Sequence, residues 1–245
     1  MRKFGLIGYP LGHSFSGKYF GNKFIAAGIK DCTYSNFEIA NISLLPDILK
    51  DPELEGLNVT IPYKESVIPF LHSKDIVVQQ TGACNCIHIK GGHLFGFNTD
   101  VKGFEESLTE KLKDSDRFAL ILGTGGSSKA VAWVLNKRAI QFLFVSRKKS
   151  DNADHIVYDD LTSELLEKYT LIINCTPLGM EPETGNYPPI PYEFVSSVHY
   201  LFDLVYNPSK TLFLYKGEKA GARIKNGSDM LAIQAEASWN IWNGD

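Results

Sequence analysis

Short apolar stretches alternate with amphipathic stretches along the whole chain, and each has the length of a single strand or helix. In the first part the pattern predicts strand, helix, strand, short helix and strand, in that order, at residues 4–7, 18–27, 34–39, 44–50 and 56–59. Strands that alternate with helices are typical of an α/β sheet with parallel strands. Two further stretches, 84–90 and 94–97, flank Gly91-Gly92, so we expect a hairpin that adds an antiparallel strand to this sheet.

The alternation resumes after a helix that Asp100 is expected to cap and that extends to about residue 113. The following strands and helices are expected at residues 118–122, 127–137, 141–146, 161–169, 171–174, 200–204 and 211–220. This order predicts a doubly wound, Rossmann-like sheet. A last helix, 228–243, is expected to pack back on the first part of the chain. We therefore predict an α/β protein with two domains, one formed by residues 1–100 and 226–245 and the other by residues 101–225.

Composition and charge are those of an ordinary globular protein, with 44% hydrophobic and 22% charged residues. The longest apolar runs, such as 118–122 and 171–173, are far too short to span a bilayer, and no signal-like segment precedes the first strand, so we expect a cytoplasmic protein. The net charge of −3 gives no general attraction to nucleic acid or to anionic membranes. The four cysteines lack the paired spacing of zinc sites, and we assign no metal.

A glycine-rich turn joins the expected strand 118–122 to the helix that follows it. Glycine at positions 123, 125 and 126 allows the backbone to approach a pyrophosphate, and the amide groups that open the helix at Ser127 supply hydrogen-bond donors. A glycine turn also occurs as a simple connection between a strand and a helix. Its position between a buried strand and a helix nevertheless favours a dinucleotide site.

The next expected strand ends in Ser146-Arg147-Lys148, at the position where an NAD enzyme carries an acidic residue for the ribose hydroxyls. Cations at this position suit a 2′-phosphate, which predicts NADP as the cofactor. One alternative is an exposed basic turn without a ligand. Another is that Asp151 folds back toward the ribose and permits NAD.

Two polar segments each follow an apolar strand, and they contain Lys64 and Asp100. A lysine and an aspartate in contact can transfer a proton, and proton transfer beside a nicotinamide indicates a dehydrogenase. Each residue also has a structural interpretation, with Lys64 as a solvated lysine and Asp100 as a helix cap. Ser14 and Ser16 follow the first strand and belong to a hydroxyl-rich loop that also suits a helix start.

Taken together, the motifs resemble those of the shikimate dehydrogenase family, over nearly the whole chain. That family reduces 3-dehydroshikimate with NADPH in aromatic amino-acid biosynthesis. The similar blocks are H-S-x-S at 13–16, N-V-T-x-P-x-K at 58–64, the segments 82–85 and 98–100, N-x-T-x-x-G-M at 174–180, D-x-x-Y-x-P-x-x-T at 203–211, and the segment 226–234. The resemblance implies a substrate domain of residues 1–100 and 226–245 and an NADP domain of residues 101–225, with the reaction in the cleft between them.

The resemblance also implies a role for individual side chains. The catalytic pair is Lys64 and Asp100. The substrate carboxylate is bound by Ser14 and Ser16, and the remaining substrate contacts are Thr60, Asn85, Tyr206 and Gln234. The cofactor contacts are Gly123, Gly125, Gly126, Ser127, Ser146, Arg147, Lys148, Thr176 and Gly227. We expect a monomer or a homodimer that acts on a small molecule.

Several positions depart from the family pattern, among them Gly17, Cys86 and Lys129. Gly17 stands where proline is usual, Cys86 where threonine is usual, and Lys129 where arginine is common. Two other functions are compatible with the motifs. The first is a quinate/shikimate dehydrogenase of broader specificity. The second is a non-catalytic sensor that binds shikimate-like ligands or NADP, although such a protein should have lost Lys64 or Asp100.

Overall fold

The computed structural model of the chain describes residues 1–12 and 15–244. The chain forms two compact units, Met1–Asp100 with Leu231–Asp245, and Val101–Met230. The chain therefore leaves the first unit at the start of the helix Asp100–Thr109 and returns to it within the last helix, Ser228–Asn243. Among the described residues, no helix is both long and apolar enough to cross a membrane.

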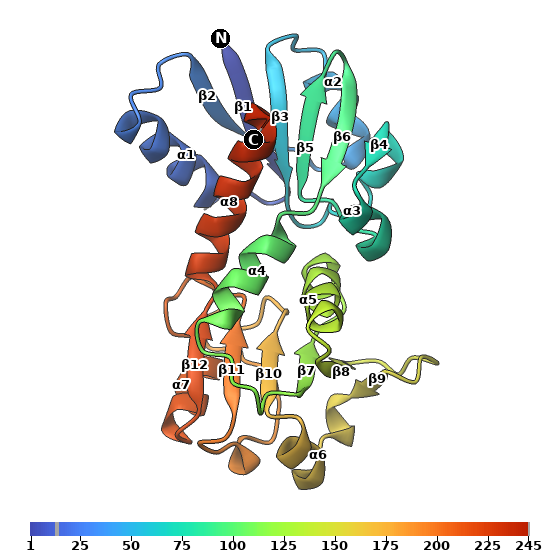
Figure 1. Cartoon of the computed structure of the whole chain (residues 1–245), viewed down its shortest axis with the longest axis vertical. Helices are drawn as coiled ribbons and strands as arrows, with labels where there is room; N and C mark the ends of the chain where they lie inside the picture. Colours follow the sequence, from blue (N-terminus) through green and yellow to red (C-terminus); the bar gives the residue numbers. More distant parts are fainter. Residues whose placement is uncertain (13–14, 245) are drawn as a thin grey trace. The chain divides into compact units, whose positions relative to one another are not determined.

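The first unit contains a mixed six-stranded sheet with the order β2-β1-β3-β5-β6-β4 (Figure 1). Its strands are β1 (Arg2–Gly8), β2 (Cys32–Glu38), β3 (Leu54–Val59), β4 (Ser73–Lys74), β5 (Cys86–Lys90) and β6 (His93–Phe97). β1 runs parallel to β2 and β3, and β5 is antiparallel to both β3 and β6. The predicted hairpin is therefore confirmed. Since β5 opposes both neighbours, β3 and β6 point the same way and end at the same edge of the sheet.

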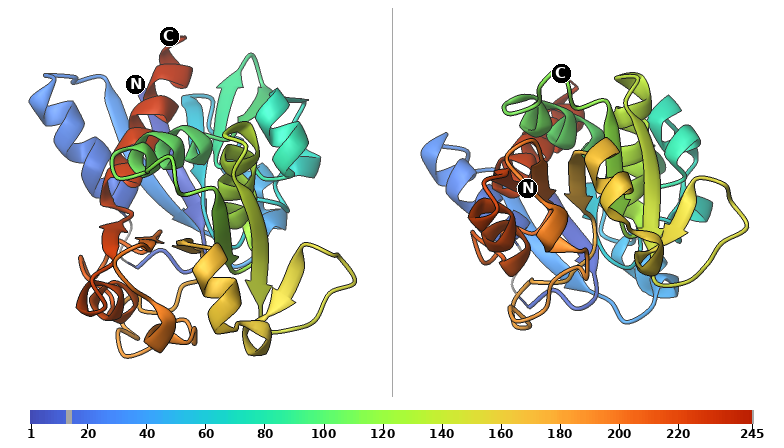
Figure 2. Two further views of the ribbon diagram at one scale, coloured as in Figure 1. Left: turned by 60° about the horizontal axis from the view of Figure 1, so that its bottom comes forward. Right: turned by 90° about the horizontal axis from the view of Figure 1, so that it is seen from below.

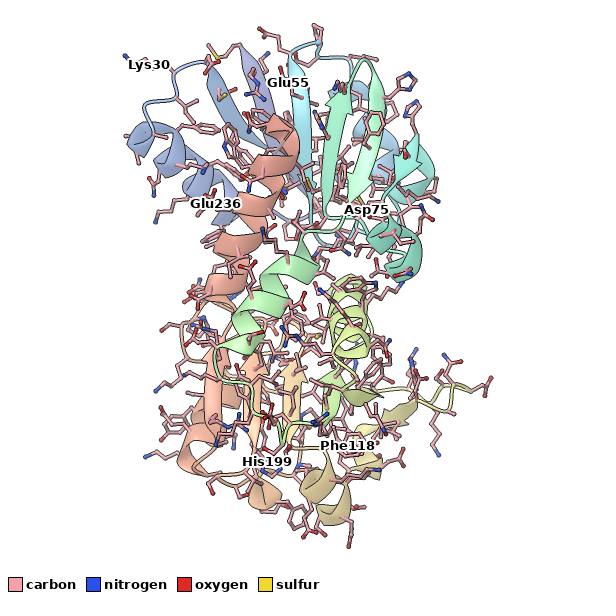
Figure 3. The ribbon with its side chains drawn as sticks, in the orientation of Figure 1. Lys30, Glu55, Asp75, Phe118, His199 and Glu236 are labelled. Atoms are coloured by element: carbon pink, nitrogen blue, oxygen red, sulfur yellow. The ribbon has the colours of Figure 1, made fainter. Side chains whose placement is uncertain are left out.

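The helices of this unit are α1 (Phe15–Ala26), α2 (Leu45–Ile48), α3 (Ile76–Thr81) and most of α8 (Ser228–Asn243). An aromatic cluster joins α8 to the sheet and to α1, and it consists of Phe4, Phe20, Phe24, Trp239 and Trp242. Within it Trp242 stacks on Phe4 at a centroid distance of 4.8 Å and donates a hydrogen bond to the Ile87 carbonyl at 3.0 Å. On the side of α8 that faces α1 (Figure 3), Glu236 accepts hydrogen bonds from Tyr19 and Lys23. Both contacts hold the last helix in the first unit.

The second unit contains a parallel six-stranded sheet with the order β12-β11-β10-β7-β8-β9. Its strands are β7 (Phe118–Leu122), β8 (Gln141–Ser146), β9 (His155–Val157), β10 (Leu171–Asn174), β11 (Tyr200–Asp203) and β12 (Arg223–Asn226). Renumbered from β7, the order is 3-2-1-4-5-6, which is that of the Rossmann fold. The predicted fold class is therefore confirmed.

The helices that accompany this sheet are α4 (Asp100–Thr109), α5 (Gly126–Lys137), α6 (Ser163–Lys168) and α7 (Leu212–Lys219). α5 packs against β7 and β8, and α7 packs against β11 and β12. The central strands are almost continuously apolar because both of their faces are covered, as is usual in parallel sheets. The loop between β8 and β9 projects from the sheet of this unit in every view (Figures 1 and 2).

Replacing Gly56 by alanine should destabilise the first unit. A Cβ atom at Gly56 would lie 2.4 Å from the indole nitrogen of Trp242, which is buried and stacked on Phe4. Overpacking of this kind costs about 1–3 kcal/mol. We expect a lower unfolding midpoint for Gly56→Ala in urea, followed by tryptophan fluorescence.

The matched control is Gly21→Ala on α1, where no atom lies within 4 Å of the added Cβ. Its midpoint should stay the same or rise slightly, because alanine favours the helix. If Gly56→Ala and Gly21→Ala had the same midpoint, the close contact with Trp242 would not constrain the fold.

Candidate functional site

Lys64 and Asp100 form an ion pair in the first unit. The Nζ atom of Lys64 lies 2.6 Å from Oδ2 of Asp100, and the two side chains are only 13% and 8% exposed. Lys64 follows β3 and Asp100 follows β6, and these strands end at the same edge of the sheet. The backbone of Lys64 is also held in place, because its carbonyl accepts a hydrogen bond of 2.7 Å from the amide of Cys84.

Asn85 occupies the space between the ends of these two strands. Its carbonyl accepts a hydrogen bond from Val59 of β3, and its amide donates to the carbonyl of Phe97 of β6. Its side-chain nitrogen donates to Oδ1 of Asp100 at 2.8 Å, and its side-chain oxygen accepts from the amide of Thr99 at 2.7 Å. Both carboxylate oxygens of Asp100 therefore have a donor, one from Lys64 and one from Asn85.

Gln234 reaches the same cluster from α8. Its Oε1 atom lies 3.4 Å from Nδ2 of Asn85 and 3.4 Å from Oγ1 of Thr99. Its Nε2 atom donates to the carbonyl of Leu231 at 3.0 Å. The structure thus brings Gln234 together with Asn85, and through Asn85 with Asp100, although the two segments lie at opposite ends of the chain.

Ser16 is connected to this cluster through two residues that the sequence analysis did not assign. Ser16 is buried and lies next to the hydroxyl of Tyr34, and that hydroxyl donates to Oδ1 of Asn58 at 2.9 Å. Asn58 in turn approaches the carbonyl of Asn85 at 3.4 Å. Burial raises the pKa of Tyr34, which keeps the phenol protonated as a donor. No local motif marks Tyr34, and only its tertiary contacts reveal it.

The two other predicted contacts of the first unit are Thr60 and Ser14. Thr60 directly follows β3 and is half-buried, and its methyl group lies close to Gly8 at the end of β1. It therefore lies at the same sheet edge as Lys64. Ser14 falls outside the described residues.

The glycine turn of the second unit connects β7 to α5. Gly123 has φ of +102°, a conformation that favours glycine, and a Cβ atom there would lie 3.0 Å from the methyl group of Thr176. Gly125 precedes α5 without a side-chain cap, and no atom lies within 4 Å of a Cβ placed there. The backbone is therefore open at Gly125, directly before α5, and a helix start of this kind can accept a phosphate group.

The basic turn lies directly beside this loop. The amide of Gly123 donates to the carbonyl of Val145 in β8 at 2.8 Å, so the ends of β7 and β8 are joined. Ser146 closes the turn by donating to the carbonyl of Lys148 at 2.6 Å, and Arg147 and Lys148 are exposed. Two exposed cations at the end of the second Rossmann strand fit a 2′-phosphate.

Asp203 organises the ends of β10 and β11. This fully buried carboxylate accepts hydrogen bonds from Asn174 at 2.9 Å and from Thr211 at 2.5 Å. Asn174 also accepts from the hydroxyl of Thr176 at 2.6 Å, so Thr176 is fixed against the glycine turn. Burial is the main cause that raises the pKa of Asp203 to about 6, against the lowering effect of its hydrogen bonds.

The remaining predicted contacts, Tyr206 and Gly227, lie in the second unit after β11 and β12. Tyr206 is half-buried in the segment that Asp203 anchors. Gly227 packs so closely on this segment that a Cβ atom would lie 2.3 Å from the carbonyl oxygen of Leu204. Among the described residues, no group of three histidine, cysteine or acidic side chains is arranged to hold a metal ion.

Comparison with known proteins gives consistent results over the whole chain. A family model described as the shikimate dehydrogenase substrate binding domain matches residues 6–87. The chain is 34% identical to the shikimate dehydrogenase (NADP(+)) of Caldanaerobacter subterraneus subsp. tengcongensis, covering 99% of this chain and 91% of that protein. It is 36% identical to the enzyme of the same name from Carboxydothermus hydrogenoformans, covering 98% and 91% of the two chains.

A solved structure supports the same relationship. The structure of shikimate 5-dehydrogenase from Thermus thermophilus, in complex with NADP(H) and shikimate, superposes with a TM-score of 0.84 at 28% identity. The alignment covers 100% of this chain and 94% of that one.

The raised pKa of Asp203 predicts a specific pH dependence of stability. A carboxyl group whose pKa rises from 3.8 to about 6 on folding contributes stability that is fully present below about pH 4 and is lost as the pH rises through 6. Each pKa unit corresponds to about 1.4 kcal/mol, so the loss is on the order of 3 kcal/mol. Asp203→Asn imitates the protonated form and should lose this dependence.

The measurement is the unfolding temperature of wild type and Asp203→Asn from about pH 4.5 to 7.5, a range that spans the raised pKa. The wild type should become less stable relative to the variant as the pH rises. A constant difference over this range would show that Asp203 keeps an ordinary pKa.

Proposed function

Because the chain belongs to the shikimate dehydrogenase family, we propose that it catalyses the reversible, NADPH-dependent reduction of 3-dehydroshikimate to shikimate in aromatic amino-acid biosynthesis. The observation that carries the proposal is the ion pair of Lys64 and Asp100, held by Asn85 in a largely buried polar cluster. A charged pair removed from solvent is costly unless its hydrogen bonds are satisfied. Its presence at a sheet edge, where α/β proteins bind ligands, supports a catalytic role.

In the proposed complex the first unit binds the substrate. Ser14 and Ser16 bind the carboxylate, and the ring hydroxyls are bound by Thr60, Asn85 and Gln234, with Tyr206 as a further substrate contact. Ser16, Asn85 and Gln234 are buried, and hydrogen bonds from the Thr99 amide and from Asn85 orient Asn85 and Gln234. Such preorganised polar contacts discriminate strongly against analogues that lack a hydroxyl group.

The proposed chemistry needs one hydride and one proton. Bound NADPH supplies the hydride to the carbonyl carbon. The ammonium group of Lys64 donates its proton to the carbonyl oxygen as negative charge develops there, which yields the alcohol and leaves Lys64 as an amine. Asp100 orients Lys64 through their hydrogen bond. In the oxidation of shikimate the amine of Lys64 accepts the hydroxyl proton instead.

We propose that the second unit holds NADP through two groups of residues. The pyrophosphate is bound by the turn and helix start, Gly123, Gly125, Gly126 and Ser127. The 2′-phosphate is bound by Ser146, Arg147 and Lys148. Thr176 and Gly227 complete the cofactor contacts, and the close packing of Thr176 on Gly123 supports this assignment.

A second candidate is a quinate/shikimate dehydrogenase of broader specificity, since the same polar cluster suits both ring acids. Steady-state assays with shikimate and quinate, each with NADP and NAD, distinguish the two. The non-catalytic sensor is disfavoured because Lys64 and Asp100 are both present and paired. We further propose that the protein acts in the cytoplasm as a monomer or a homodimer.

Lys64→Ala should lower kcat by roughly 10²- to 10⁴-fold, the usual contribution of a positioned acid or base. The KM for shikimate should change much less, because Ser16, Asn85 and Gln234 remain. Lys50→Ala is the matched control, since Lys50 forms an exposed ion pair with Asp47 in the same unit. A turnover of Lys64→Ala within a few-fold of wild type would refute the role of Lys64.

Arg147→Ala should reduce the preference for NADP over NAD by at least about tenfold. A charge-assisted hydrogen bond contributes about 1.5–3 kcal/mol, and about 1.4 kcal/mol corresponds to a tenfold ratio. The measurement is kcat/KM with each cofactor, and Arg117→Ala, on an exposed arginine of the same unit, is the control. Equal use of NAD by the wild type, or an unchanged ratio in Arg147→Ala, would rule out this turn as the phosphate site.

A further inference from the structure

The hydroxyl of Ser238 lies where α8, β3, β5 and the segment after β6 meet. Ser238 is completely buried, one helical turn after Gln234. Its Oγ atom donates to the carbonyl of Gln234 at 3.0 Å, accepts from Nδ2 of Asn58 at 2.9 Å and lies 3.2 Å from Oγ1 of Thr99. The buried thiol of Cys86 on β5 lies next to it. One hydroxyl therefore joins α8 to β3 and to the segment after β6.

The partners of Ser238 are connected to the proposed substrate contacts. Thr99 holds the side chain of Asn85 through its amide at 2.7 Å, and it directly precedes Asp100. Asn58 approaches the carbonyl of Asn85 at 3.4 Å. Ser238 is therefore connected to Asn85 through Asn58 and through Thr99, and it contacts Gln234 directly.

We propose that Ser238 is a positioning residue for the reaction, whose hydroxyl holds Asn85 and Gln234 in the orientation that binds the substrate ring. In the family position 86 is usually threonine, which would carry a hydroxyl on β5. Here position 86 is a cysteine, and Ser238 supplies the hydroxyl from α8 instead. The side chains of Ser238 and Cys86 are both fully buried and lie next to each other. A thiol is a weaker hydrogen-bonding group than a hydroxyl and does not replace it. This inference rests on the proposed function.

A purely structural role predicts something different. Serine in a helix often donates to the carbonyl four residues earlier, and the bond to Gln234 has this form. The contacts with Asn58 and Thr99 lie outside that pattern. A structural role would therefore change the unfolding temperature alone, whereas a positioning role also changes substrate binding.

The test is the steady-state kinetics of Ser238→Ala with shikimate and NADP. We expect KM for shikimate to rise about tenfold, which corresponds to about 1.4 kcal/mol, with kcat within about threefold of wild type. The reason is that Asn85 and Gln234 contact the substrate in the ground state as well as in the transition state. Ser238→Cys replaces the hydroxyl by a slightly larger thiol, leaves no cavity and should show the same rise, so the test stands if the alanine variant does not fold.

The rescue experiment places the hydroxyl on the neighbouring strand. In Cys86→Ser/Ser238→Ala the new hydroxyl lies at the same junction, and KM should return to within about threefold of wild type. Ser107→Ala is the matched control, because Ser107 is a buried serine on α4 whose hydroxyl has no hydrogen bond within the described part of the chain. Its KM should equal that of wild type.

The outcomes separate this inference from the proposed function. An active wild type together with an unchanged KM in folded Ser238→Ala and Ser238→Cys would refute the positioning role alone. A folded double variant that keeps the raised KM would refute the exchange of hydroxyls between positions 86 and 238. A wild type without activity on shikimate would refute the proposed function, and this inference with it.

Discussion

The ion pair of Lys64 and Asp100 is the interaction on which the polar site of the first unit depends. Removing two charges from water costs several kcal/mol for each ion, so the pair persists only where other groups complete its hydrogen bonds. The topology provides this place. β3 and β6 end at one edge of the sheet, and Asn85, directly before β5, lies between their ends. The side-chain amide of Asn85 donates a hydrogen bond of 2.8 Å to Oδ1 of Asp100, the carboxylate oxygen that Lys64 does not contact.

The last helix supports this edge with two chemically different faces. Trp239 and Trp242 pack in the aromatic cluster around Phe4. Gln234 and Ser238 point instead to the polar residues beside Asp100. The apolar contacts supply the free energy that holds α8 in place, and this permits its polar side chains to remain buried at a defined position.

The second unit also depends on a buried carboxylate. Its glycine turn is open at Gly125, and the turn is held by the ends of two neighbouring strands, through Val145 and Thr176. Asp203 fixes Thr176 indirectly through Asn174 and also begins the segment that carries Tyr206. The glycine turn and this segment therefore share one buried carboxylate as their support.

The sequence by itself determined the alternation of elements and the doubly wound second sheet, because these follow from local patterns, whereas most of the proposed site residues came from the resemblance of whole motifs to a family. The bounds of β7, β8, β10 and α8 agree with those expected, since long apolar runs and clear turns mark them. The strands β4, β9 and β12 were missed because they lack the fully buried apolar run that marks β10, and α3 was missed because its six residues make fewer than two helical turns. Only the tertiary structure decided which polar groups meet: Asn58 and Ser238 are separated by 180 residues, and the pairing of strands with the returning helix, not any local signal, brings them into contact.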